Sequence, residues 1–186
     1  MTTPLHSGAR LVVPVTERDH RIGPSDAPAT LVEYGDYQCP YCGMAHPVVA
    51  ELLRRRGDRV RYVFRHFPLS NVHPYAELAA EAAEAAGARG RFWEMHDWLY
   101  GHQAELDPVA LMTGLDTLGL DTGAVIEELR DHRYQDRVRA DFIGGVRGGV
   151  NGTPTFFVNG QRHEGGATLP ELLTAVDRAA DGTARI

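Results

Sequence analysis

The stretch Val32-Glu33-Tyr34-Gly35-Asp36-Tyr37-Gln38-Cys39-Pro40-Tyr41-Cys42 decides the fold, because it joins a strand to a helix through two cysteines. Cys39 and Cys42 are the only cysteines of the 186 residues. Residues 30–35 are typical of a β-strand, and residues 45–56 are typical of an amphipathic helix. A cysteine at such a junction lies at the positive end of the helix dipole, which lowers the thiol pKa. We therefore expect the pair to cycle between dithiol and disulfide.

The composition favours one folded domain, or one domain with an insertion, that has its own apolar core. Hydrophobic residues make up 43% of the chain, and the net charge of −6 argues against a nucleic-acid surface. No run approaches the roughly 20 apolar residues of a membrane span. Residues 1–21 lack the apolar segment of a signal peptide, so we expect a cytoplasmic protein without membrane partners. In a reducing compartment, a CxxC pair is more often catalytic or metal-binding than structural.

The periodicity along the chain predicts a β-α-β unit followed by a long helical block, a hairpin and a last helix. We expect an edge strand at residues 11–15, because Pro14 cannot donate to a ladder. Further strands are predicted at 30–34 and 60–67, helices between 74 and 149, and a hairpin around Asn159-Gly160. A capping box at residues 168–171 predicts the start of the terminal helix.

With these elements in place, the chain resembles the thioredoxin superfamily and, within it, the DsbA-like proteins. The motifs that carry the resemblance are residues 32–42 and Gly152-Thr153-Pro154-Thr155-Phe156-Phe157-Val158-Asn159-Gly160. The long separation of Cys42 from Pro154 matches a helical insertion of the DsbA type. The resemblance implies an α/β fold, namely a thioredoxin fold with a large helical insertion.

The same resemblance divides the chain into three parts. Residues 1–22 would form an N-terminal extension with an edge strand. Residues 23–70 and 150–180 would form the thioredoxin-like domain, and residues 71–149 the inserted helical domain.

The resemblance also implies roles for the two thiols and one acid. Cys39 would be the nucleophile, Cys42 the resolving thiol, and Glu33 the semi-buried acid behind Cys42. Unpaired N–H groups of the first helical turn can stabilise a thiolate at Cys39, which we expect to reach solvent. Cys42 lies one turn further, so we expect less exposure and a higher pKa. A buried carboxylate with a raised pKa could accept its proton through water.

Four residues are predicted to meet the substrate. By resemblance, Pro154 is a cis-proline facing the disulfide, and the backbone of Thr153 docks the substrate strand. Pro40 and Tyr41 lie between the cysteines, where they would contact a bound peptide.

These features predict a protein thiol–disulfide oxidoreductase that exchanges disulfides with protein or peptide substrates, as a monomer or weak dimer without a cofactor or metal. Two alternatives with other ligands stay open. The Pro40-Tyr41 pair is similar to that of glutaredoxin, which favours a disulfide reductase linked to a low-molecular-weight thiol. Cys39 and Cys42 could instead bind a metal or metal cluster, with His46 as a third ligand. A last alternative is a peptide-binding module with a structural disulfide.

Overall fold

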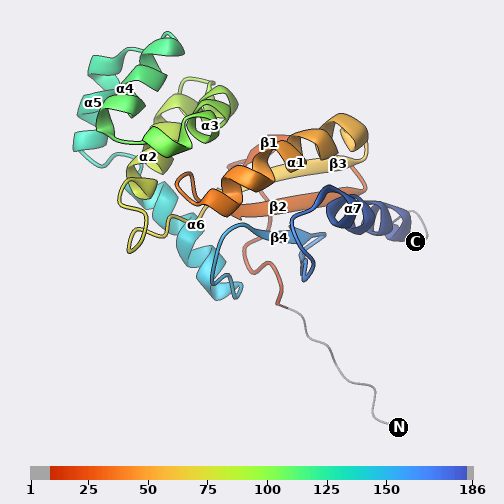
Figure 1. Cartoon of the computed structure of the whole chain (residues 1–186). Helices are drawn as coiled ribbons and strands as arrows, with labels where there is room; N and C mark the ends of the chain where they lie inside the picture. The colour runs from red at the N-terminus through yellow and green to blue at the C-terminus, as the bar shows by residue number, and fades with distance from the viewer. Residues whose placement is uncertain (1–8, 184–186) are drawn as a thin grey trace.

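The computed structural model describes residues 9–183 as an α/β fold built on a five-stranded sheet (Figure 1). The strand order is β1-β3-β2-β4-β5. The strands are β1 His20–Ile22, β2 Ala29–Gly35, β3 Val60–His66, β4 Thr155–Val158 and β5 Gln161–Arg162. The helices are α1 Pro40–Arg56, α2 Ala76–Gly87, α3 Phe92–Gly101, α4 Pro108–Thr117, α5 Thr122–Arg130, α6 Gln135–Arg147 and α7 Leu169–Thr183, with a 3-10 turn η1 at Gln103–Glu105.

The centre of the sheet is the predicted β-α-β unit, closed by an antiparallel strand. Strands β2 and β3 are parallel and are joined by α1, while β4 runs antiparallel to β2. Val32 in β2 lies opposite Val63 and Phe157, so apolar side chains continue across three strands. Such β-branched and aromatic cross-strand neighbours stabilise a sheet. The carboxyl end of β2 therefore leads directly into the loop before Cys39.

Each face of the sheet has its own core. Leu31, Phe64 and Phe156 belong to the larger cluster, which also contains buried residues of α1 and α7. Val32, Val63 and Phe157 point the other way into a smaller cluster, against which Phe142 of α6 packs. Because successive strand residues alternate between faces, this division follows from the strand pattern.

Five helices are inserted between β3 and β4. Figure 1 shows α2–α5 gathered to one side of the sheet, while α6 runs back along it. Helix α6 packs on β3, and all seven alanines of α2 are buried. Asp107 and Asp121 are the N-caps of α4 and α5, since their side chains accept hydrogen bonds from N–H groups in these helices. The predicted α/β fold with a helical insertion is confirmed.

The predicted strand at residues 11–15 is wrong, and the edge strand is β1 instead. The carbonyl groups of Val13 and Pro14 accept hydrogen bonds from the Arg65 guanidinium at 2.8 and 2.9 Å. These two carbonyl groups therefore bind the buried Arg65 side chain instead of pairing with a neighbouring strand. Residues 1–8 of the predicted N-terminal extension lie outside the described residues.

The hairpin turn is the one that the sequence predicts. Asn159 and Gly160 have φ angles of 46° and 78°, so both adopt the left-handed conformation of a two-residue hairpin turn. The turn pairs β4 with β5, and the loop before β4 reaches the start of α1, where Thr153 contacts Cys39.

Candidate active site

Cys39 is the N-cap residue of α1, and its sulfur therefore lies at the positive end of that helix. The carbonyl group of Cys39 accepts the N–H of Gly43 at 3.1 Å, which begins the helix. A hydrogen bond from the Cys42 thiol lowers the pKa of Cys39 to about 5, against the opposing effect of burial. Backbone N–H groups of Cys42 and Tyr41 contribute to the same lowering. Cys39 is thus a thiolate at neutral pH.

Neither cysteine is in a disulfide and both are buried, which corrects the expectation of a solvent-open Cys39. Cys39 is 3% exposed and Cys42 is fully buried. The Cys39 thiol lies 3.3 Å from the carbonyl oxygen of Thr153, so the loop before β4 covers the sulfur. Burial raises the pKa of Cys42 far above its ordinary value. The two thiols therefore differ strongly in acidity although they are three residues apart.

Glu33 lies on β2 within the apolar face of the sheet, where it is 2% exposed. Its carboxylate accepts a hydrogen bond from the Tyr62 hydroxyl at 2.7 Å. Burial raises the pKa of Glu33 to about 7, although the bond from Tyr62 opposes this rise. The Cys39 charge raises this pKa, and Glu33 in turn raises the pKa of Cys42. Glu33 can therefore gain or lose a proton close to neutral pH beside the dithiol.

The residues predicted to meet a substrate lie around Cys39. The Thr153–Pro154 peptide bond is cis, as the resemblance implied, and both residues are partly exposed. Pro40 and Tyr41 are exposed, with 65% of Tyr41 accessible. Met44, which the sequence analysis did not single out, is 61% exposed in the same first turns of α1. These partly apolar side chains can form one side of a peptide-binding surface.

The sequence analysis also missed Gln103, which joins the insertion to the start of α1. Its side-chain amide donates to the carbonyl groups of Tyr37 and Cys39 at 2.8 and 2.7 Å. A Cβ atom at Gly43 would lie 2.2 Å from the Gln103 amide oxygen, so a larger residue there would displace the Gln103 amide. No motif marks a lone glutamine in a 3-10 turn, and only the fold reveals this contact.

Asp36 is a second missed residue, and it holds the loop between β2 and α1. Its buried carboxylate accepts hydrogen bonds from the N–H groups of Gln38 and Leu69 at 2.7 and 2.8 Å. The His73 ring contacts the same carboxylate at 2.7 Å. The Asp36 N–H in turn points at the Cys42 sulfur at 3.5 Å. Asp36 therefore holds the loop before Cys39 in place through its contacts with Gln38, Leu69 and His73.

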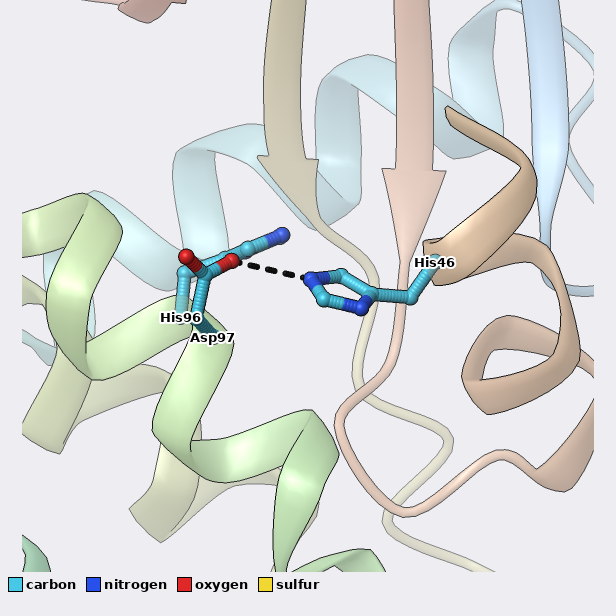
Figure 2. A group of neighbouring side chains, drawn as sticks. All are labelled: His46, His96 and Asp97. Carbon is cyan, nitrogen blue, oxygen red and sulfur yellow. Dashed lines mark hydrogen bonds and ion pairs between the residues drawn. The ribbon is translucent and has the colours of Figure 1, made fainter. Parts of the chain in front are cut away.

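The alternative of a metal site at Cys39 and Cys42 has no support among the described residues. Within residues 9–183, the group of His, Cys, Asp and Glu side chains close enough to share an ion is His46, His96 and Asp97 (Figure 2). That group contains neither Cys39 nor Cys42. His46, the third ligand of that alternative, is half-buried and turned toward Asp97 of α3.

The sequence matches the thioredoxin family over residues 15–178. Among curated proteins, the chain is 53% identical over 174 residues to the protein named Na(+)/H(+) antiporter NhaA 1 of Salinispora arenicola (strain CNS-205). That match covers 93% of this chain and 26% of the relative, so the chain spans about a quarter of the relative's length. Over residues 9–183, no helix is both long enough and apolar enough to cross a membrane.

Solved structures share the whole architecture. A thioredoxin-like oxidoreductase from Silicibacter pomeroyi DSS-3 is 28% identical with a TM-score of 0.80, and the match covers 89% of this chain and 94% of that one. BdbD from Bacillus subtilis has a TM-score of 0.82 at 22% identity, with 94% of this chain and 98% of that chain covered. Alpha-DsbA1 from Wolbachia pipientis has a TM-score of 0.81 at 18% identity, covering 94% and 96% of the two chains. The helical insertion is therefore part of the shared fold.

Proposed function

The chain belongs to the thioredoxin family and has a DsbA-like fold, and from that premise we propose that it exchanges disulfides with protein or peptide substrates through Cys39 and Cys42. The observation that carries this proposal is the unequal acidity of two adjacent thiols. Cys39 has a pKa of about 5 at the start of α1, whereas burial raises the pKa of Cys42. Cys39 can therefore attack as a thiolate, whereas Cys42 stays protonated until the second step.

The reaction that follows is thiol–disulfide exchange in two steps. The Cys39 thiolate attacks one sulfur of a substrate disulfide, which forms a mixed disulfide and releases one substrate thiolate. Cys42 then loses its proton to Glu33 and attacks the Cys39 sulfur, which releases the second substrate thiolate. The substrate gains two electrons, and Cys39 and Cys42 become a disulfide. The reverse sequence oxidises a substrate dithiol.

A substrate strand would dock beside Pro154. Proline has no N–H, and Thr153 leads into β4 directly over Cys39. An extended peptide beside this loop would place a cysteine sulfur close to Cys39, with Tyr41 available for apolar contact.

The acidity of Cys39 favours disulfide donation over reduction. A stabilised thiolate makes the reduced form more stable, so the disulfide becomes a stronger oxidant. We expect a reduction potential above about −200 mV in equilibrium with glutathione. A value of about −200 to −230 mV, as in glutaredoxins, would instead favour the reductase linked to a low-molecular-weight thiol. The cytoplasmic location stays a prediction. In the reducing cytoplasm, a reduction potential above about −200 mV would keep Cys39 and Cys42 in the dithiol form.

Single serine variants test the assignment of the thiols. Cys39→Ser should abolish turnover of a peptide disulfide, whereas Cys42→Ser should still attack and accumulate the mixed disulfide, which mass spectrometry detects. Alkylation of the reduced chain over a pH series should show Cys39 half-reactive near pH 5 and Cys42 unreactive. Equal labelling of both thiols at every pH, or turnover by Cys39→Ser, would contradict the proposal.

A further inference from the structure

A group of three side chains joins α1 to α3 outside the dithiol, and we propose that His46, His96 and Asp97 bind a divalent transition-metal cation such as Zn²⁺. Figure 2 shows His46 reaching from α1 toward the two residues of α3. One ligand atom from each residue lies within 4.8 Å of the other two. Zinc bonds of about 2.0–2.1 Å in tetrahedral geometry need ligand atoms roughly 3.3 Å apart. The ligand atoms would therefore have to move together by at most about 1.5 Å to bind the ion.

His46 and Asp97 form the accessible side of the site. The His46 Nε2 and Asp97 Oδ1 atoms are 2.9 Å apart, so the two groups already face each other (Figure 2). Their side chains are 25% and 70% exposed, so an ion can enter from solvent. His46 lies one helical turn beyond Cys42, and the group includes neither cysteine.

His96 forms the buried side of the site, where its ring is held in place. It is 3% exposed and packs edge-on against Phe64, with ring centroids 4.6 Å apart. Its Nδ1 lies 3.1 Å from the Tyr37 hydroxyl, the only hydrogen-bond partner of the ring within residues 9–183. The Nε2 atom is therefore the nitrogen left for a ligand. A hydrogen bond to the far ring nitrogen is the arrangement that orients metal-binding histidines.

The donor set decides the class of ion. Two imidazoles and one carboxylate suit zinc and its neighbours among the transition metals, whereas calcium and magnesium prefer sites built from oxygen. Three protein ligands leave a coordination position for water. A bound ion would tie α1 of the thioredoxin-like domain to α3 of the insertion. The site does not depend on the proposed redox function, because it uses other side chains.

Calorimetric titration of zinc chloride into the tag-free Cys39→Ser/Cys42→Ser chain tests the proposal without sulfur ligands. We expect binding of one Zn²⁺ per chain, and a weakening of about tenfold or more in His46→Gln and in Asp97→Asn. Both side chains are accessible, so these variants should fold. His102→Gln, an exposed histidine at the end of α3, is the matched control and should bind as the parent does.

Two further measurements distinguish this site from surface binding. Tyr37→Phe removes the partner of His96 and should weaken zinc binding about tenfold while leaving all three ligands in place. Zinc should also raise the melting temperature of the parent double variant but not that of its His46→Gln form. Absence of binding at millimolar zinc, or equal binding by the parent, His46→Gln and Asp97→Asn chains, would overturn the proposal.

Discussion

Two buried glutamates, Glu33 at the dithiol and Glu84 at the base of the insertion, have pKa values shifted in opposite directions. Glu33 is 2% exposed and Glu84 is 7% exposed. Burial raises the pKa of Glu33 to about 7. Burial also acts to raise the pKa of Glu84, but hydrogen bonds from His20 and His66 overcome it and hold that pKa far below the ordinary range. The difference shows that the partners, and not the depth, decide the charge of a buried acid.

The hydrogen-bond partners of Glu84 and Glu33 give the two side chains different roles. One oxygen of Glu84 meets His20 Nε2 at 2.9 Å and His66 Nε2 at 2.8 Å, and so connects α2 to β1 and β3. Glu84 is a permanent anion that holds the insertion on the sheet. Glu33 has the single neutral partner Tyr62, so its charge is easily lost. That property suits proton exchange with a thiol and costs stability when the carboxylate ionises.

The largest expected effect follows from removing the permanent anion. Glu84→Ala leaves the buried His66 and the partly buried His20 without their common partner and should lower the free energy of unfolding at pH 7 by about 3–5 kcal/mol. The folded pKa is below the unfolded value of 4.5, so this stabilisation is complete above pH 4.5 and lost as pH falls below it. Urea unfolding at several pH values should therefore show the deficit shrinking below pH 4.5.

A surface acid supplies the control for this loss. Glu94 in α3 is an exposed partner of Arg91, and Glu94→Ala should change stability by less than about 0.5 kcal/mol. An equal loss in Glu84→Ala and Glu94→Ala would show that the buried position of Glu84 is unimportant.

The opposite pH dependence is expected at Glu33. Its folded pKa is above the unfolded value of 4.5, so the stabilising protonated form is lost as pH rises through about 7. Glu33→Gln keeps an acceptor for Tyr62 and cannot ionise. At pH 8 the reduced variant should therefore be more stable than the parent by about 3 kcal/mol, since one pKa unit corresponds to about 1.4 kcal/mol. At pH 4 the two proteins should unfold alike, and a constant difference would refute the assigned pKa.

The same variant should be slower in catalysis. Without its proton acceptor, Cys42 should resolve the mixed disulfide about tenfold or more slowly, while the attack by Cys39 changes little. Stopped-flow kinetics separates the two steps. If both rates equal those of the parent, Glu33 affects stability alone.

An effect smaller than at either buried acid is expected at a neutral contact between the insertion and α1. Gln103→Ala removes two hydrogen bonds to backbone carbonyls and should cost about 1–2 kcal/mol, with no dependence on pH between 4 and 8. Gln103→Glu cannot donate these bonds and is the matched variant of equal size. A loss as large as that of Glu84→Ala would remove the distinction between charged and neutral contacts.

Much of the fold could be predicted because its signals are local. The turn at Asn159-Gly160 and the N-caps Asp107 and Asp121 each depend on a few neighbouring residues. The strand predicted around Pro14 failed for a non-local reason, since Arg65 binds the carbonyls there. In the site, a strand-to-helix junction was enough to identify Cys39, but its burial under Thr153 was not predictable.

By itself, the sequence determined the dithiol, the junction that presents it, and the order of strands and helices. These features depend on side chains within a few residues of one another, so local geometry controls them. Only the tertiary structure decided which distant groups surround the thiols and the acids. Thr153 lies 114 positions from Cys39, and Glu84 lies 64 positions from His20. Such neighbours meet only after whole helices and strands have packed, and that packing determined the charge of each buried acid.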